Sequence, residues 1–457
     1  MRNRSLIVPA LSLLISWLMI TPSFADSHAR IVRLSQVDGD VQIDRATGQG
    51  FEKAFLNLPV TQGVKVKTGL DGRAEIEFED GSAVRITPNT QISFPELSLK
   101  DSGGKVSTVN LQEGTAYVNF LSGKNDKTDQ FNLTFGKENV ALNDAAHLRL
   151  QMGDVDAAVA VFKGTVQISG PSGNFEVAKN KTANFDFTKP DKYELAKNLE
   201  EDPYDEWDKQ QSEYHDRYVT NNSYNGYSPY AYGTTDLNYY GSFIDAPGYG
   251  MLWQPYFAGA GWDPYMSGVW SYYPGYGYSW VSAYPWGWLP YHYGNWIYAP
   301  GYGWGWQPGG SWAGLVTQPR YTGGPTGFVP PKAPGAGVAT VAVNRGGSFA
   351  TARDGFLGPK MTIAQNSAGL GIPRGSIRNL GPLSTRAQER GSVSTRLPVS
   401  TAPSWTGFGG PAYRGSSIGA GRTGSFGGSR GVSSPHMSTG GGRMSSGGHV
   451  GGSTGHR

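Results

Sequence analysis

The sequence contains no cysteine in its 457 residues. This absence excludes disulfide bonds, thiolate metal centres, cysteine nucleophiles and lipid attachment through cysteine. No HExxH, GxSxG or P-loop pattern occurs, and the seven histidines are scattered without the spacing of metal ligands. We therefore expect a protein that is not an enzyme, with no catalytic residue, no metal site and no cofactor.

Long hydrophobic runs are also absent, except near the N-terminus. Residues 1–25 combine Arg2 and Arg4, an apolar run and a small-residue site at 23–25, which is the pattern of a secretory signal peptide cleaved before Asp26. An uncleaved membrane anchor is the alternative, although the run is shorter than the about 20 residues that a spanning helix needs. We expect a mature chain with no transmembrane helix, exported and soluble in the periplasm or outside the cell.

Basic residues are missing from the middle of the chain. Residues 221–319 contain no Lys or Arg and only three acidic residues, whereas residues 191–220 contain 4 basic and 10 acidic residues and residues 320–457 contain 15 and 2. Platforms that stack nucleic-acid bases need cations among their aromatic side chains. The middle region is therefore not expected to bind nucleic acid.

Trp, Tyr, Pro and Gly dominate residues 235–312 and form a repeat. Residues 262–280 and 288–306 share eleven of nineteen positions at a spacing of 26, giving WxPYxxGxWxYxPGYGxxW, and residues 235–253 form a weaker third copy. A fixed period indicates repeated supersecondary units. The Pro-Gly-Tyr-Gly cluster predicts a turn between short strands, so we expect small β-type aromatic repeats.

Two interpretations of these rings remain open. Trp and Tyr can build the core of a small module, or some rings can stay exposed and stack on the C–H faces of sugars, as in carbohydrate-binding or cell-wall-binding repeats. The second interpretation predicts a glycan-binding site. Its candidate ligand-binding residues are Trp262, Tyr265, Trp270, Trp288, Tyr291 and Trp296.

Residues 26–190 alternate apolar and polar side chains with a period of two, which is typical of half-buried strands. The clearest hairpin spans residues 73–86, with its turn at Asp80 and Gly81. Many short strands predict an all-β sandwich, barrel or solenoid. In the hairpin, apolar and acidic side chains are expected on opposite faces: Ala74, Ile76 and Phe78 against Glu75, Glu77 and Glu79.

Several stretches of this region are similar to a known family. DGSAVRITPNT at 80–90, LQEGTAYV at 111–118 and VAVFKGTVQI at 159–168 resemble FecR-type domains, and the resemblance covers about residues 31–188. It implies a non-catalytic, all-β periplasmic domain. FecR itself is an envelope signal transducer with a cytoplasmic segment before a membrane helix; only a few residues precede the apolar run here, so we do not expect the transducing role.

Residues 191–220 are acidic and rich in helix formers, which predicts a short amphipathic helix with Asp202 and Pro203 at its start. We expect it to pack on a neighbouring part of the chain; a partner-binding helix is the alternative. The sequence DPYDEW at 202–207 resembles secreted proteins in which a FecR-type domain is followed by an acidic helix and Trp-rich modules of unknown function. The expected apolar face contains Tyr204, Trp207, Gln211, Tyr214 and Tyr218.

Residues 333–457 are rich in Gly, Ser and Arg and are predicted to be disordered, because they contain too few apolar residues to fold. The expected architecture is thus mainly β, with a disordered tail.

The leading hypothesis is an exported envelope protein with a binding or scaffold role, whose aromatic repeat binds a glycan such as peptidoglycan. The alternative is a periplasmic sensor or regulator whose FecR-like domain binds a protein partner. The sequence indicates no particular oligomeric state.

Overall fold

The computed structural model describes residues 30–121, 129–219, 231–312, 319–335, 338, 340–344 and 361–397. The chain divides into two units, residues 1–403 and 404–457, and every described residue belongs to the first unit. The predicted signal peptide at residues 1–25 lies outside the described residues, as does most of the predicted tail.

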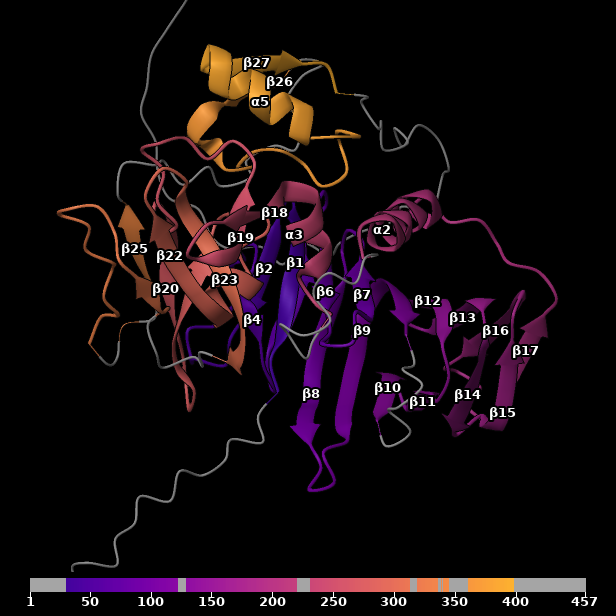
Figure 1. Cartoon of the computed structure of the whole chain (residues 1–457). Coiled ribbons are helices and arrows are strands. Elements are labelled where there is room, and N and C mark those ends of the chain that lie inside the picture. Colours follow the sequence, from indigo (N-terminus) through magenta and orange to yellow (C-terminus); the bar gives the residue numbers. More distant parts are fainter. Residues whose placement is uncertain are drawn as a thin grey trace, which may run out of the picture. The chain divides into compact units, whose positions relative to one another are not determined.

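Short strands fill the described residues from 32 to 196, as the alternating pattern predicts (Figure 1). They are β1 (Val32–Asp38), β2 (Val41–Asp44), β3 (Glu52–Lys53), β4 (Pro59–Val60), β5 (Lys65–Thr68), β6 (Arg73–Glu77), β7 (Ala83–Ile86), β8 (Gln91–Leu99), β9 (Lys105–Phe120), β10 (Gln130–Phe135), β11 (Glu138–Leu142), β12 (Ala146–Met152), β13 (Asp156–Lys163), β14 (Thr165–Gly170), β15 (Gly173–Ala178), β16 (Lys181–Asp186) and β17 (Tyr193–Ala196).

These strands form two sheets that share the long strand β9. Residues 105–113 of β9 pair with β8 in the first sheet, and residues 114–120 pair with β12 in the second sheet. Gly114 lies at the change of sheet with φ 87°, and a Cβ there would lie 2.5 Å from the carbonyl oxygen of Asn89, so this corner needs glycine. Apolar side chains from both sheets form one core, which fits the sandwich among the predicted alternatives.

The predicted hairpin at residues 73–86 is confirmed. β6 pairs with β7 in antiparallel register, and Gly81 takes φ 88° in the turn. Ala74 and Ile76 are buried in the core between the sheets. Because side chains alternate along a strand, the acidic residues of β6 point to the outer face of the second sheet.

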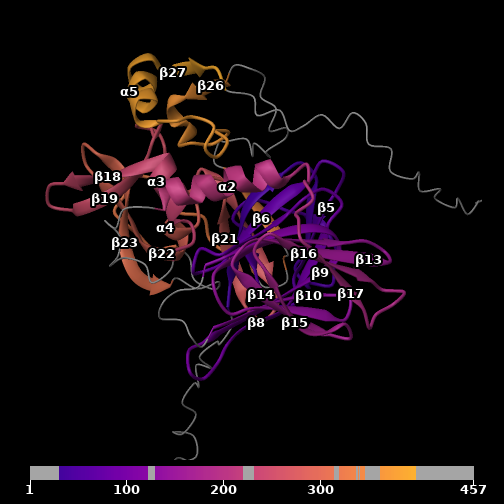
Figure 2. The ribbon, with the colours of Figure 1, turned by 90° about the vertical axis from the view of Figure 1, so that its right-hand side faces the viewer.

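The acidic segment contains a strand and a helix. Residues 193–196 form β17, and the helix α2 (Asp205–Tyr218) begins later than the composition suggests. The N-cap residue is Tyr204, whose backbone N–H donates to Asp202, so the expectation that Asp202 caps the helix was wrong. Helix α2 packs on the second sheet (Figure 2). No helix in the part of the chain that the structure describes is long and apolar enough to cross a membrane.

Each copy of the aromatic repeat forms a β-hairpin closed by its Pro-Gly-Tyr-Gly turn. The first and third hairpins lie in one sheet, in the order β18-β19-β23-β22-β24, and the second pairs with β25 in another sheet. We call residues 231–344 the aromatic module. Its elements are α3 (Thr234–Tyr240), β18 (Gly241–Ala246), β19 (Gly250–Pro255), β20 (Ser267–Tyr273), β21 (Gly277–Ser282), α4 (Leu289–His292), β22 (Tyr293–Ala299), β23 (Gly303–Trp312), β24 (Tyr321–Thr322) and β25 (Thr340–Asn344).

In the first two copies of the repeat, the glycine two residues before the central aromatic residue makes room for a tryptophan. A Cβ on Gly241 would overlap the ring of Trp253, and a Cβ on Gly268 would overlap the ring of Trp280. Trp253 and Trp280 are the last residues of the first and second copies. In these two copies the indole ring therefore packs directly against the glycine of the neighbouring strand, whereas a Cβ on Gly294 of the third copy would overlap the Gln307 carbonyl oxygen.

Residues 361–397 fold, although the sequence predicts disorder from residue 333 onward. They form β26 (Met361–Ala364), the 3-10 helix η1 (Gln365–Ser367), α5 (Gly381–Arg390) and β27 (Ser392–Thr395), which we call the C-terminal lobe. The lobe has few apolar residues of its own. It buries Met361, Ile363, Ile372 and Leu380 in the same core as the tryptophans of the aromatic module. For residues 361–397 the prediction of disorder was wrong, because their apolar partners come from elsewhere in the chain.

Candidate functional site: a buried charge network

The outer face of the second sheet is ionic, yet it is buried. Glu75 and Glu77 of β6 are 0% and 1% exposed. Across the neighbouring strands, Arg85 of β7 faces Glu75 and Arg33 of β1 faces Glu77. Arg85 Nε donates to Glu75 Oε2 at 2.7 Å, and Arg33 Nη1 donates to Glu77 Oε2 at 3.1 Å. Opposite charges therefore pair across adjacent strands.

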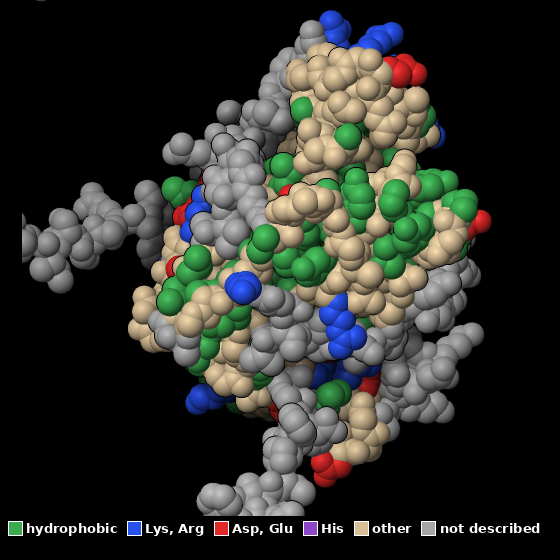
Figure 3. All heavy atoms as spheres, turned by 60° about the vertical axis from the view of Figure 1, so that its left-hand side comes forward, with side chains coloured by type: hydrophobic (Ala, Val, Ile, Leu, Met, Phe, Trp, Pro, Cys, Tyr) green, Lys and Arg blue, Asp and Glu red, His purple; other side chains and the backbone are tan. Residues whose placement is uncertain are grey.

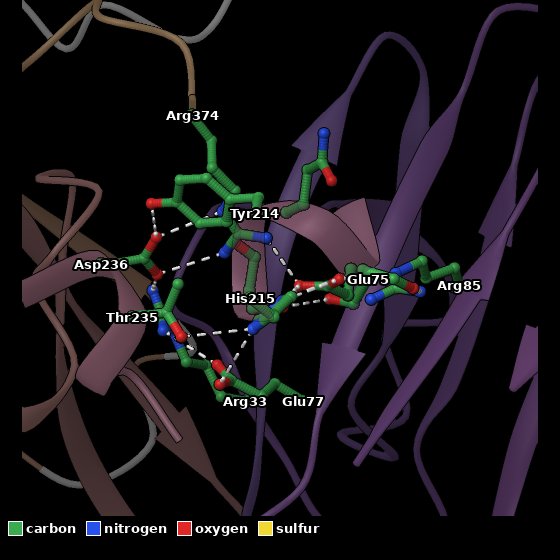
Figure 4. A network of polar contacts seen from close by, with 12 residues as sticks. Arg33, Glu75, Glu77, Arg85, Tyr214, His215, Thr235, Asp236 and Arg374 are labelled. Atoms are coloured by element: carbon green, nitrogen blue, oxygen red, sulfur yellow. Dashed lines mark hydrogen bonds and ion pairs between the residues drawn. The ribbon is translucent and has the colours of Figure 1, made fainter. Parts of the chain in front are cut away.

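Helix α2 covers this face with charged as well as aromatic side chains. Arg85 Nη1 donates to Asp208 Oδ1 at 2.7 Å. His215 places its Nε2 3.0 and 3.1 Å from the two carboxylate oxygens of Glu75. Figure 4 shows Glu75 between His215 and Arg85. The helix thus fits the expectation of packing on a neighbouring part of the chain, and it does so partly through ion pairs.

Helix α3 of the aromatic module adds a second carboxylate. Arg33 Nη2 donates to Asp236 Oδ2 at 2.6 Å, although 203 residues separate the two. Tyr214 of α2 donates its hydroxyl to Asp236 Oδ1 at 2.9 Å. One buried carboxylate therefore joins the FecR-like β domain, helix α2 and the aromatic module (Figure 4).

Arg374 brings the C-terminal lobe into the same network. Its Nη1 donates to Glu75 Oε1 at 2.6 Å, and its Nε and Nη2 donate to the two oxygens of Asp236 at 3.2 and 3.1 Å. Nη2 also donates to the Ser35 carbonyl oxygen at 2.8 Å. The guanidinium lies 5.0 Å from the ring centre of Tyr214. Such bidentate, stacked geometry is specific to arginine.

A smaller ionic cluster fixes the start of α2. Tyr117 donates its hydroxyl to Asp202 Oδ1 at 2.8 Å and to Asp205 Oδ1 at 2.9 Å. Arg149 Nη1 also donates to Asp205 Oδ1, at 2.6 Å. We use the name charge network for the larger set alone: Arg33, Glu75, Glu77, Arg85, Asp208, Tyr214, His215, Asp236 and Arg374.

The surroundings shift the pKa values of the carboxyl groups in different directions. Burial raises the pKa of Glu75, but His215, Arg374 and Arg85 outweigh burial and hold it well below its ordinary value. Burial also acts on Asp236, and Arg374 and Arg33 lower its pKa below the ordinary range. These two carboxylates therefore stabilise the fold above their ordinary pKa, and this contribution is lost as the pH falls through their lowered values.

Glu77 behaves differently. Burial raises its pKa and Arg33 only partly offsets the effect. A raised carboxyl pKa favours the protonated form in the folded state, so any stability from Glu77 is present at low pH and is lost as the pH rises through the raised value. The network thus contains one carboxyl group whose charge is imperfectly compensated.

Thr235, His215 and Glu75 lie in the order of the nucleophile, base and acid of a catalytic triad. Thr235 Oγ1 lies 3.3 Å from His215 Nδ1. However, Thr235 is 1% exposed, so no substrate can reach its hydroxyl. Among the residues that the structure describes, no group of three or more His, Cys, Asp or Glu side chains could hold a metal ion. What the arrangement can do is hold segments of one chain together and select for arginine at one position.

All six candidate ligand-binding residues are buried. Trp262, Tyr265, Trp270, Trp288, Tyr291 and Trp296 are between 0% and 4% exposed. Trp262 and Trp296 meet edge to face with ring centres 5.8 Å apart, and Tyr265 meets Tyr291 at the same distance. Ligand binding by these six rings stays a prediction; in this structure they build the core of the aromatic module and offer no free ring face.

Sequence reasoning missed the ring at the centre of this core. Trp286 lies between the second and third copies of the repeat and is fully buried. It contacts Trp253, Trp262, Tyr284 and Trp296 at ring-centre distances of 4.9 to 6.0 Å. Its position outside the periodic motif gave it no weight in the sequence, although a tryptophan between repeat copies was a usable signal.

Two known families match separate parts of the chain. Residues 64–167 match the family described as "FecR protein", and residues 234–334 match the "Family of unknown function (DUF6600)". The chain therefore carries a FecR domain followed by a DUF6600 region, and the resemblance to FecR-type domains is confirmed. No curated protein matches this chain.

Two solved structures resemble part of the chain. Both are of a "putative anti-sigma factor" from Parabacteroides distasonis, at 1.65 and 2.50 Å resolution. The first has 17% identity and a TM-score of 0.26, and the second 16% and 0.25. Each match covers 29% of this chain and 59% of the other, so the chain spans about three fifths of the length of those proteins.

Proposed function

We propose that this chain is an exported, non-catalytic protein of the regulator type, whose β domain, which contains the FecR match, binds a protein partner in the cell envelope. The family match supports a regulatory rather than a catalytic class. The observation that carries the proposal is that the chain itself covers one part of the second sheet and leaves another part exposed. Its ionic face is occupied by the chain's own α2, α3 and Arg374, whereas its last strand, β17, is exposed.

Strand β17 has the features of an edge that accepts another strand. Among the described strands it pairs only with β16. Tyr193 and Leu195 are two of the large hydrophobic side chains that reach solvent. Tyr193 is held in place by stacking on Phe175, with ring centres 3.5 Å apart. An exposed, ordered edge with apolar side chains suits a partner that adds a β-strand.

A photo-crosslinking residue in place of Leu195 tests this proposal in cells that produce the whole protein. We expect one adduct of defined mass from position 195, lost when Tyr193→Glu is added to disturb the edge. Leu70 is the matched control position, because it is also an exposed leucine but lies in a turn. No adduct, or equal labelling from positions 195 and 70, would overturn the proposed partner site.

A second candidate function is glycan binding by the aromatic module, and exposed turn tyrosines favour it. Tyr249 and Tyr302, in the first and third Pro-Gly-Tyr-Gly turns, are 38% and 46% exposed. Residues 241–312 contain two aspartates and no Lys or Arg. Figure 3 shows hydrophobic side chains gathered on one face of the molecule, with few charged side chains among them. An uncharged aromatic surface suits sugar rings better than phosphates.

The two tyrosines lie at opposite ends of the strand pair β19–β23. The Gln254 side chain donates to the Tyr302 carbonyl oxygen at 2.7 Å, and the Gln307 side chain donates to the Tyr249 carbonyl oxygen at 3.4 Å. The antiparallel register places Trp253 opposite Trp306 between them. Each tyrosine is thus a separate contact point, and a long polymer could engage both.

The change Tyr249→Ala with Tyr302→Ala tests glycan binding. We expect the double variant to lose about tenfold or more in affinity for insoluble peptidoglycan, measured by co-sedimentation, which corresponds to about 1.4 kcal/mol. Tyr276→Ala is the matched control, because Tyr276 occupies the same turn position in the second copy but packs against the core of the β domain. It should lower the melting temperature and leave binding unchanged. Equal binding by the wild type, the double variant and Tyr276→Ala would contradict a role for the exposed rings.

A further inference from the structure

The C-terminal lobe is attached to the rest of the chain mainly by side-chain contacts, with one backbone hydrogen bond from the Ala368 N–H to the Phe257 carbonyl oxygen at 3.2 Å. Its strands β26 and β27 pair with each other and with no other described strand. Tyr239 donates its hydroxyl to the Ile377 carbonyl oxygen at 2.9 Å, and Trp286 Nε1 donates to the Ala368 carbonyl oxygen at 2.7 Å. No sheet hydrogen bond of the described residues therefore has to break for the lobe to leave.

The pocket that holds Arg374 is built entirely from residues outside the lobe. Glu75 and the Ser35 carbonyl belong to the β domain, Tyr214 to α2 and Asp236 to α3. Together they supply acceptors for all three guanidinium nitrogens and an aromatic ring whose centre lies 5.0 Å from the guanidinium carbon; Glu75, Asp236 and Tyr214 surround Arg374 in Figure 4. The lobe contributes the ligand and the rest of the chain contributes the site.

The pocket is also held in shape without Arg374. Glu75 accepts hydrogen bonds from Arg85 at 2.7 Å and from the Ser35 hydroxyl at 2.6 Å. Asp236 accepts from Arg33 at 2.6 Å and from Tyr214 at 2.9 Å. Both carboxylates are therefore oriented by partners that would remain if the lobe moved away, which is the preorganisation that a binding site needs.

Removal of Arg374 would leave the pocket short of positive charge. The acids of the network are Glu75, Glu77, Asp208 and Asp236, and its remaining arginines are Arg33 and Arg85. Four carboxyl groups and two guanidinium groups then remain, together with His215 and with His147, whose Nε2 lies 2.7 Å from Asp208 Oδ2. Buried carboxylates without counter-charges are unstable, so an open pocket would strongly favour a new cation.

We propose that this pocket is a binding site for an arginine on an extended peptide, and that residues 372–375 of the chain fill it as an internal ligand. The site also constrains the neighbouring residue. Gly375 takes φ 68°, and a Cβ there would lie 3.1 Å from Cδ2 of the Tyr214 ring. The ligand is therefore an Arg-Gly segment, presented either by another protein or by the C-terminal lobe of a second copy. This site is separate from the edge strand β17, so the two proposals can fail independently.

The test uses the full mature chain with Arg374→Ala and a fluorescent peptide of residues 371–376, Gly-Ile-Pro-Arg-Gly-Ser. We expect saturable binding to the variant, measured by anisotropy, and at least tenfold weaker binding to the wild type, whose own Arg374 competes. The same peptide with lysine in place of arginine should bind the variant at least tenfold more weakly, because an ammonium group cannot make the bidentate contacts.

Absence of binding to a folded Arg374→Ala variant, or equal binding of the arginine and lysine peptides, would overturn the proposal. If the variant does not fold, its far-UV circular dichroism is compared in millimolar guanidinium and in the same concentration of sodium chloride. Recovery of structure with guanidinium alone supports the site, and no recovery overturns it. Light scattering then separates the two sources: a wild-type dimer that Arg374→Ala abolishes identifies the second copy, and a monomer excludes it.

Discussion

Replacement of Glu75 by alanine is expected to lower the free energy of unfolding by about 3–5 kcal/mol, because it breaks a buried ionic network by removing one partner. Glu75 is fully buried and compensates Arg85 and Arg374 at 2.7 and 2.6 Å. Without it, both guanidinium groups remain in the interior with less opposite charge. Urea unfolding followed by circular dichroism measures the loss.

The matched control is Glu113→Ala, which removes an exposed glutamate from β9 and should change stability by less than about 0.5 kcal/mol. A second readout is the acid limb of the stability curve. Since the pKa of Glu75 lies well below its ordinary value, the wild type loses stability as the pH falls below about 4.3, and the variant should lose less. Equal losses of stability for the variants at positions 75 and 113 would contradict the role assigned to the network.

The alternation of side chains in β6 could be predicted from the sequence, but the burial of its outer face could not. Ala74 and Ile76 lie in the core as expected. A glutamate that alternates with apolar residues normally faces water, and only a cover from elsewhere changes this. Part of that cover comes from Asp236 and Arg374, which lie 203 and 299 residues away from their partners Arg33 and Glu75. Local patterns carry no information about contacts at such separations.

In the aromatic repeat, too, the local structure could be predicted from the sequence but the long-range packing could not. Its hairpins and turns follow from Pro-Gly-Tyr-Gly, because this cluster specifies a local backbone shape. The choice between buried and exposed rings depends on how the hairpins associate. Tyr276 is partly buried against the β domain, whereas Tyr249 and Tyr302 occupy equivalent turns and reach solvent. Three copies of one motif therefore have different surroundings, which a repeat alone cannot reveal.

Trp286→Ala is expected to lower the free energy of unfolding by about 3–5 kcal/mol, the usual range for the loss of a large aromatic side chain from a core. Trp286 is 0% exposed and stacks on Tyr284 with ring centres 4.9 Å apart. Its indole N–H also donates to the Ala368 carbonyl oxygen of the C-terminal lobe. Thermal unfolding and near-UV circular dichroism should show loss of both stability and ring order.

Two further variants divide this effect into its parts. Trp286→Phe keeps a ring in the core but removes the hydrogen bond to the lobe, so we expect a smaller loss than with alanine. Tyr302→Ala removes an exposed ring from the same module and should change stability by no more than about 0.5 kcal/mol. If Trp286→Ala melts at the same temperature as Tyr302→Ala, the tryptophans do not form a cooperative core.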